Sequence, residues 1–517
     1  MSKQENSTII LSENMQESLD KKDKTIQELL AQNNTLKEHI KLLDQKIDYL
    51  TRQLFSQKSE KLPDGQLSLF ADEEEKEIES IEEEKIEIIY TRAKGGKKRP
   101  PAHLPRVRVE HDILDEEKIC SCGCQKKVMK EIITEQYDII PAKFQVIQNV
   151  RFVYACPDKC GVSPKTTPLA PQMLPKCQVT PSFLATIAVQ KFEDHLPLYR
   201  QVKIYNSRFD GDFTTTTFSN WMIKASQLVL VYMINLLNEI LIQSDYIQAD
   251  ETTLQVLNEE NREAKQKSYI WVRGTTTNNK IVIMDYSPTR AKVNANKIFN
   301  RFEKGYLQTD GYAGYNDIAN KHNIEQLGCW AHIRRKFTDT VKNSKVDDKS
   351  KTLASNIILK IGKLYKIEKD IKDLPPDKKQ KIRIEKSQPI INNIKEYIDE
   401  NMFLAIKLDS YIKKAFVYVN NQFPKLIVYL KDGRLNIDNN IAENHIRPIA
   451  VGRKNWLFAN STDGAKSLTA WYSIIETAKM NKLDPYKYLT YILTQIPIYR
   501  YNNKSLEDLL PWNVKLD

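Results

Sequence analysis

The sequence has few cysteines and no long apolar run, and these absences exclude several classes of protein. Seven cysteines in 517 residues are too few for a disulfide scaffold. No stretch reaches the roughly 18 uninterrupted apolar residues of a membrane span. Residues 1–6 lack the apolar stretch of a signal peptide. We therefore expect a soluble cytoplasmic protein without a membrane partner.

The length and the charge of the chain point to several domains and to a polyanionic partner. A chain of 517 residues exceeds the size of one ordinary hydrophobic core, so several domains are expected. The net charge of +11 is a moderate basic excess. Such an excess favours a partner such as nucleic acid without establishing one.

An apolar heptad runs through residues 19–54. Its first apolar position holds Leu19, Ile26, Asn33, Ile40, Ile47 and Leu54. Its second holds Leu29, Leu36, Leu43 and Leu50. Isoleucine and leucine at these positions, with one asparagine, favour a parallel two-stranded coiled coil in which Asn33 fixes the register. A lone amphipathic helix packed on its own domain is the alternative. The coiled coil predicts a homodimer or a higher oligomer.

A charge reversal follows the heptad. Residues 72–87 hold ten acidic residues and two lysines, whereas residues 92–108 are basic and contain glycine and proline. A flexible basic arm of this kind can follow phosphates or enter a minor groove. A solvated linker is the alternative interpretation. The candidate DNA contacts in this arm are Lys97, Lys98, Arg99 and Arg106.

Five of the seven cysteines form two tight groups. These are Cys120, Cys122 and Cys124, then Cys156 and Cys160. The strand-like residues 144–150 lie between them, and two cysteine knuckles joined by β structure predict a zinc ribbon. The spacing is irregular, so reduced thiols without metal are the alternative. Cys177 and Cys329 stand alone and are interpreted as packing residues.

Residues 180–240 are expected to be helical. Thr180-Pro181 is a helix start signal, and one of the threonines at 214–217 is expected to cap a further helix after a polar turn at 210–212. Helix, turn and helix is compatible with DNA recognition. An ordinary helical connector is the alternative.

A change from helical to strand patterns begins near residue 244. Strand signals appear at 244–250, 268–273 and 280–286, followed by a helix at 291–303, a strand before Asp310 and a strand at 324–329. Residues 331–420 are mostly helical and lysine-rich, with breaks expected at Pro375-Pro376 and at Pro389. This order predicts a ribonuclease-H-like domain with a helical insertion.

Three acidic residues carry the candidate chemistry. Asp250 and Asp310 each close an apolar run, and Glu443 lies near the start of a later helix. Carboxylates in this order suit a site for two Mg²⁺ ions, or Mn²⁺, acting on a phosphodiester. For Glu443 a capping box that begins at Asn440 is the alternative. Four further acids are also candidates: Glu251, Asp285, Asp317 and Asp438.

Several motifs together make a family resemblance. They lie at 104–106, in the two cysteine groups, and at 195–200, 249–252, 309–312, 329–337, 437–458, 476–478 and 484–486. In these motifs the chain resembles the transposases of the insertion-sequence-sixty-six family, over roughly residues 90–500. The cysteine spacing departs from the usual pattern, which leaves the zinc ligands open.

The resemblance implies a DDE-type transposase with Asp250, Asp310 and Glu443 as its triad. It implies double-stranded DNA, both element ends and target, as partner, and a nucleoid-associated location in a bacterium. Further DNA contacts are expected from His332, Arg334, Arg335, Arg447, Arg453 and Lys454. Accessory proteins encoded by the element are further expected partners. The alternatives are a non-catalytic DNA-binding regulator, a decayed transposase, or a nuclease that cleaves without joining strands.

The expected fold is multidomain α+β. Its expected parts are a coiled-coil helix (1–60), an acidic then basic linker (61–111), a Cys-rich zinc-binding domain (112–178), a helix-turn-helix-like region (179–240), the first part of a ribonuclease-H-like core (241–340), a helical insertion (341–430) and the last part of the core (431–517).

Overall fold

The computed structural model describes residues 165–516, apart from 276, 278, 322, 344–351 and 409, together with short stretches between 106 and 163. The chain forms two compact units, Met1–Pro141 and Ala142–Asp517. The heptad of 19–54 and the acidic stretch of 72–87 lie outside the described residues. The coiled coil therefore stays a prediction, as do the domain boundaries.

The segment between the cysteine groups differs from the expectation. Residues 144–150 form no strand. The short antiparallel pair lies later, between β1 (Val153–Tyr154) and β2 (Lys165–Thr166). Phe144 instead packs its ring against Phe183 at 5.2 Å, so this part of the segment is held by aromatic contact with a helix.

The expected helices of the next region are present. Both predicted starts are confirmed, because the hydroxyls of Thr180 and Thr214 accept hydrogen bonds from the first turns of their helices at 3.2 and 3.1 Å. The elements are α3 (Pro181–Phe192), α4 (Leu198–Phe209), α5 (Thr215–Ala225), the π-helix η2 (Ser226–Leu230) and α6 (Val231–Ile242).

The run from α5 to α6 is also apolar. Residues Thr215–Ile242 form one helix that is long and apolar enough to cross a membrane by length and composition. Phe218, Leu230 and Leu237 are fully buried in the main hydrophobic core of the second unit, and Ile234, Leu236 and Ile240 are partly buried against it. This burial explains the composition of the helix by packing.

A mixed sheet forms the centre of the second unit. Its strands are β3 (Tyr246–Asn258), β4 (Lys267–Thr275), β5 (Ile281–Ser287), β6 (Lys304–Gln308), β7 (Asn323–Leu327) and β8 (Ala459–Ser461). Their order is β5-β4-β3-β6-β7, with β8 paired to the far end of β3. The first three strands are antiparallel, as expected, and β6 and β7 run parallel to β3.

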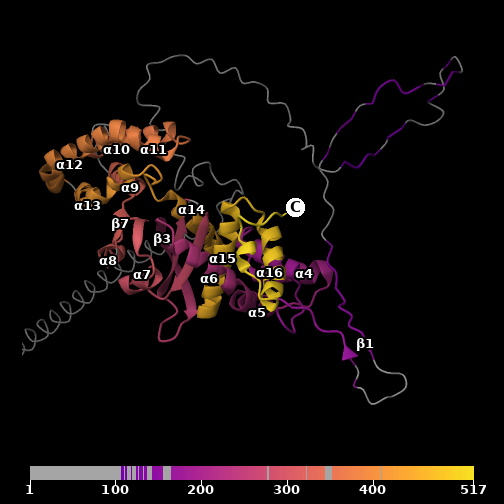
Figure 1. Cartoon of the computed structure of the whole chain (residues 1–517). Helices are drawn as coiled ribbons and strands as arrows, with labels where there is room; N and C mark the ends of the chain where they lie inside the picture. Colours follow the sequence, from indigo (N-terminus) through magenta and orange to yellow (C-terminus); the bar gives the residue numbers. More distant parts are fainter. Residues whose placement is uncertain are drawn as a thin grey trace, which may run out of the picture. The chain divides into compact units, whose positions relative to one another are not determined.

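Helices cover both faces of the sheet (Figure 1). On one face, α14 (Asn440–Trp456) bonds to Gln248, since the Ala442 amide donates to the side-chain oxygen at 3.3 Å. On the other face, Trp271 packs against Tyr315 at 5.6 Å. Tyr315 belongs to η3 (Ala313–Tyr315), between α7 (Lys292–Ile298) and α8 (Asn316–Lys321).

The C-terminal helices complete this core. They are α15 (Thr462–Met480), α16 (Pro485–Tyr501) and η7 (Leu506–Leu509). Strand β5 is an edge strand, and α15 shields it, because the hydroxyls of Thr477 and Ser473 accept from the backbone amides of Val282 and Met284 at 3.0 and 2.8 Å. Covering an edge in this way prevents it from pairing with another chain.

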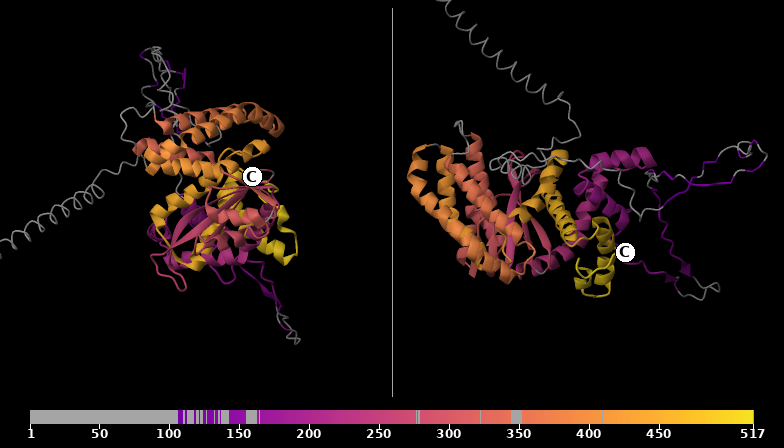
Figure 2. Two further views of the ribbon diagram at one scale, coloured as in Figure 1. Left: turned by 90° about the vertical axis from the view of Figure 1, so that its left-hand side faces the viewer. Right: turned by 90° about the horizontal axis from the view of Figure 1, so that it is seen from above.

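The helical insertion forms a second hydrophobic core beside β7, visible as the orange helices of Figures 1 and 2. Its elements are α9 (Trp330–Asn343), α10 (Leu353–Asp370), α11 (Pro376–Ile382), η5 (Arg383–Ser387), α12 (Gln388–Leu408), α13 (Ser410–Leu426) and η6 (Val428–Lys431). The break expected at Pro389 is wrong. Residues 376–408 are continuously helical, because the π-turn η5 just before Pro389 relaxes the hydrogen-bond ladder.

Candidate functional site

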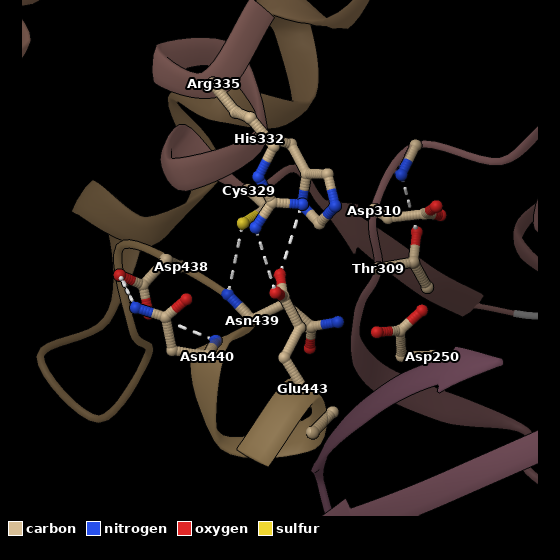
Figure 3. Close-up of polar contacts among 12 residues, drawn as sticks. Asp250, Thr309, Asp310, Cys329, His332, Arg335, Asp438, Asn439, Asn440 and Glu443 are labelled. Atoms are coloured by element: carbon tan, nitrogen blue, oxygen red, sulfur yellow. Dashed lines mark hydrogen bonds and ion pairs between the residues drawn. The ribbon is translucent and has the colours of Figure 1, made fainter. Parts of the chain in front are cut away.

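Asp250 and Asp310 lie together at one end of the parallel strand pair β3–β6. Gln248 and Gln308 are direct partners across these strands, and each aspartate comes two residues later. Oxygen atoms of Asp250, Glu251 and Asp310 all lie within 4.8 Å of one another. Figure 3 shows Asp250 and Asp310 next to each other, with Glu443 beside them. The structure thus brings together two residues that are 60 positions apart in the sequence.

The turn that presents Asp310 depends on a glycine. Gly311 has a φ of +89°, and a Cβ there would lie 2.9 Å from the hydroxyl of Tyr418. The amide of Tyr312 donates to a carboxylate oxygen of Asp310 at 2.9 Å. From α13, Tyr418 donates its hydroxyl to the Asp310 carbonyl at 2.5 Å. The helical insertion therefore helps to hold this aspartate, which no sequence signal indicated.

Glu443 approaches from α14, on the face of the sheet that carries Asp250. Side chains alternate along a strand, so Asp250 shares the face of Gln248, which α14 contacts. The Glu443 carboxylate lies 3.2 Å from Arg335 and 3.4 Å from Nδ1 of His332. These partners belong to α9 (Figure 3).

The capping-box alternative for Glu443 does not describe this helix start. The amide of Asn440 bonds to the carboxylate of Asp438 at 3.2 Å, so Asp438 fills the place that the box would give to Glu443. The side chain of Glu443 is left to face His332 and Arg335.

Glu251 follows Asp250 on β3, where side chains alternate between the two faces, and its carboxylate still lies within 4.8 Å of those of Asp250 and Asp310. Its side chain is only 1% exposed, and its carboxylate accepts from Tyr315 Oη at 2.6 Å and from Arg290 Nε at 2.6 Å. Arg290 also lies 3.6 Å from Asp310 and stacks over the ring of Tyr312 at 3.9 Å. Sequence reasoning missed Arg290 and Tyr315, because both come from segments between strands that carry no local motif.

The acids of this site repel one another. Burial, and then the neighbouring carboxylates of Glu251 and Asp310, raise the pKa of Asp250 well above its ordinary value. Burial and the charge of Asp310 also raise the pKa of Glu251, although Tyr315 and Arg290 oppose this effect. Beside Glu443, burial lowers the pKa of the His332 imidazole, because burial disfavours its charged form.

The charge of Asp250 should therefore destabilise the metal-free protein. Asp250→Asn should raise its melting temperature at neutral pH by a few degrees, since roughly 1 kcal/mol corresponds to about 2–4 °C in a domain of ~200 residues. Because the pKa of Asp250 is raised in the folded state, its ionised form destabilises the fold. The increase in melting temperature of Asp250→Asn is therefore largest above that folded-state pKa. It should shrink as the pH falls through it and vanish near the ordinary aspartate pKa.

Melting curves from neutral to acidic pH in a chelator measure this effect. Asp317→Asn is the control, because Asp317 lies 3.1 Å from Lys292 in a partly exposed pair. An Asp250→Asn protein that melts no higher than wild type at neutral pH would contradict the account.

The other acidic candidates have different environments. Asp285 forms an ion pair of 2.8 Å with the buried Arg273, and Asp317 pairs with Lys292. Asp438 bonds to the amide and side chain of Asn440 at 3.2 and 2.9 Å, at the start of α14. Asp285 and Asp317 thus have roles in ion pairs, and Asp438 caps the helix that carries Glu443.

A second group of ligand-type atoms adjoins the first. Atoms of Cys329, His332 and Glu443 lie within 4.8 Å of one another. Cys329 is buried, its sulfur accepts from the Asn439 amide at 3.3 Å, and burial raises the pKa of its thiol. A protonated thiol that already accepts a hydrogen bond is a poor metal ligand. The group therefore serves better to hold Glu443 and the start of α14.

The basic candidates differ in what they contact. Arg335 and His332 face Glu443, and Arg453 is half-buried and donates to the Thr253 hydroxyl at 2.8 Å. Arg447 and Lys454 are exposed on α14, Arg334 is partly buried on α9, and Arg106 is exposed. Lys97, Lys98 and Arg99 lie outside the described residues, so their role stays a prediction.

Four of the five candidate zinc ligands lie outside the residues that the structure describes. Cys124 is an exposed free thiol. The other four cysteines, Cys120, Cys122, Cys156 and Cys160, lie outside the described residues. Their ligand roles therefore stay a prediction.

Comparison with known proteins decides the family. The model of the Transposase IS66 family matches residues 176–467, which include both aspartates, Glu443 and the whole helical insertion. The chain belongs to the IS66 transposase family. The IS66 C-terminal element matches residues 473–512 of this family member. The earlier resemblance is thereby confirmed.

The N-terminal third matches two further models. The model described as "Transposase C of IS166 homeodomain" covers residues 42–109, and the zinc-finger binding domain of transposase IS66 covers residues 117–161. The second match spans all five clustered cysteines and supports zinc binding by this part of the IS66 family member.

Its curated relatives include three proteins from Sinorhizobium fredii (strain NBRC 101917 / NGR234). The uncharacterized protein y4qI is 30% identical over 95% of this chain and 92% of its own length. Uncharacterized proteins y4jD and y4hP are each 28% identical, over 81% and 92% of this chain and 82% and 88% of their own lengths. The similarity thus extends well beyond the acidic site.

Proposed function

We propose that this protein is an active DDE-type transposase that cleaves DNA at the ends of its element and joins them to target DNA. The observation that carries the proposal is the meeting of Asp250 and Asp310 just beyond the β3–β6 pairing, with Glu443 approaching from α14 over the face that carries Asp250. Membership of the IS66 family supports a transposase role. The strand order agrees with a ribonuclease-H-like core, which we include in the proposal.

The donor set suits hard divalent cations. Asp250, Asp310 and Glu443 offer only carboxylate oxygens, the ligands that Mg²⁺ and Mn²⁺ prefer. Burial and the neighbouring carboxylates raise the pKa of Asp250, and a cation at this point would favour the ionised form of all three acids. Two bound ions would supply neutralisation of the phosphodiester charge and activation of the attacking oxygen.

The remaining work falls to residues of the chain. Arg335 and His332 hold the carboxylate of Glu443, and Arg290 forms an ion pair with Glu251. In-line displacement at a phosphodiester depends mainly on positioning and on charge neutralisation. Exposed Arg447 and Lys454 on α14 suit contacts to DNA phosphates near the site.

The products of the reaction distinguish this proposal from its alternatives. Purified protein, Mg²⁺ and a plasmid with two element ends should yield free 3′-OH ends and then joined products. Cleavage without joining would favour a nuclease. Binding without cleavage would favour a regulator or a decayed transposase.

We further propose that the cysteine groups bind one zinc ion per chain. Metal analysis of the purified protein should find about one equivalent, because a structural site of four thiolates holds one ion. Cys156→Ser or Cys160→Ser should release zinc and unfold the local segment, since binding and folding are coupled. Cys177→Ser, outside both groups, should keep the zinc. A folded protein without zinc, with all its thiols open to titration, would contradict the proposal.

Pairing of chains through residues 19–54 belongs to the same proposal. Two element ends must come together in transposition, and a parallel coiled coil would let each chain of a dimer hold one end.

A further inference from the structure

A buried hydrogen-bonded network lies directly beneath the acidic site. It contains Gln248 and Gln308, each two residues before a proposed catalytic aspartate, and Tyr246. Gln248 is 2% exposed and Gln308 is fully buried. Burying an amide costs free energy unless its polar atoms form hydrogen bonds, so the partners of these two side chains matter for the stability of this region.

The two glutamines pair with each other across the strands. Gln248 donates from Nε2 to Oε1 of Gln308 at 2.8 Å, and the hydroxyl of Tyr246 donates to the same oxygen. Each amide therefore fixes the orientation of the other, and the pair ties β3 to β6 immediately before Asp250 and Asp310.

Both side-chain amides also form hydrogen bonds with one segment, residues 436–442. Gln308 Nε2 donates to the Asn436 carbonyl at 2.9 Å, and Gln248 Nε2 donates to the Asp438 carbonyl at 3.3 Å. Gln248 Oε1 accepts from the Ala442 amide at 3.3 Å. This segment leads directly into Glu443, so the network joins all three acids of the proposed site.

Every side-chain nitrogen and oxygen of the two glutamines has a partner in this arrangement. A fully paired network in a low-dielectric interior specifies one geometry, because any shift leaves a buried group unpaired. An apolar pair of the same size would fill the space without setting the register of α14 against the strands.

We infer that Gln248 and Gln308 are positioning residues that set Glu443 at its working distance from Asp250 and Asp310. This inference rests on the proposed function, because it gives the acids their role as metal ligands. Both glutamines are buried beneath the acids, and they act through their hydrogen bonds to the start of α14.

The test is Mn²⁺ binding by the full chain, measured by electron paramagnetic resonance, with Gln248→Met and Gln308→Met. Methionine keeps the length of the side chain and removes its hydrogen bonds. Each variant should weaken Mn²⁺ binding at least about tenfold, which corresponds to ~1.4 kcal/mol. Gln201→Leu is the matched control, since Gln201 is also fully buried and its amide donates to the Ile187 and Leu196 carbonyls, remote from the acids in the sequence.

A double-mutant comparison separates positioning from a general loss of stability. In a Glu443→Gln background, Gln248→Met should weaken Mn²⁺ binding no further, because the ligand that it positions is already lost. Hydrogen exchange should show faster exchange of the amides of residues 439–443 in Gln248→Met and unchanged exchange in Gln201→Leu.

Three outcomes would overturn the inference or its basis. Wild-type Mn²⁺ affinity in folded Gln248→Met and Gln308→Met would remove the positioning role. So would an equal loss of affinity with and without Glu443. Absence of Mn²⁺ binding in the wild-type protein would instead remove the proposed acidic metal site itself, and the inference with it.

Discussion

Asp250→Asn and Asp310→Asn should each lower cleavage of element-end DNA on the order of 10²–10³-fold or more, because each removes a charge that neutralises and positions the reacting groups. DNA binding should persist, since neither aspartate supplies a phosphate contact and each change removes a negative charge. The structural reason is the position of the two residues, each two positions beyond the last paired residues of β3 and β6. Single-turnover cleavage assays, with gel-shift titrations of the same proteins, measure both effects.

Asp317→Asn is the matched control for this pair. It makes the same chemical change in the same unit of the chain, at a residue whose carboxylate lies 3.1 Å from Lys292. Its cleavage rate should stay near that of wild type. Normal cleavage by either site variant would remove that aspartate from the catalytic set.

Glu443→Gln should be as damaging as the aspartate changes, and Glu251→Gln should be much less so. Glu443 approaches the face of β3 that carries Asp250, whereas the carboxylate of Glu251 is already engaged by Arg290 and Tyr315. Cleavage assays in Mg²⁺ and in Mn²⁺ should show near-complete loss for Glu443→Gln. For Glu251→Gln we expect a reduced rate with retained metal dependence.

The reverse ranking would make Glu251 the third ligand. Its oxygens do lie within 4.8 Å of those of Asp250 and Asp310, so this outcome is a real competitor. A Glu443→Gln protein that cleaves normally but melts lower would support the capping role that the Asn440–Glu443 sequence pattern also allows. We do not expect that result, because the Asn440 amide already donates to the carboxylate of Asp438.

Much of the sheet was predictable because its strands and turns carry local signals. Apolar runs ending at Asp250 and Asp310 marked β3 and β6, and Thr180 and Thr214 marked helix starts through their capping hydroxyls. The three antiparallel strands followed from the strand signals at 244–250, 268–273 and 280–286, although β3 continues past the predicted end to Asn258. These features depend on residues close in the sequence, which is why a single sequence carries them.

The support of the site was not predictable in the same way. Gln248 and Gln308 look like ordinary polar residues within apolar runs, and only the β3–β6 register makes them partners. Tyr418 reaches Asp310 from a helix 108 positions later. Strand β8 and the continuous helix through Pro389 were missed for the same reason, since tertiary packing decided them over local propensity.

Localised cutting of the polypeptide tests the central claim most directly. Fe²⁺ replaces Mg²⁺ in carboxylate sites of this kind, and with peroxide and ascorbate it generates hydroxyl radicals that cut the nearby backbone. The account predicts three cuts in the folded full chain, near residues 250, 310 and 443, which are lost together in Asp250→Asn and suppressed by excess Mg²⁺. Cuts confined to other parts of the chain, or unchanged cuts in Asp250→Asn, would contradict it.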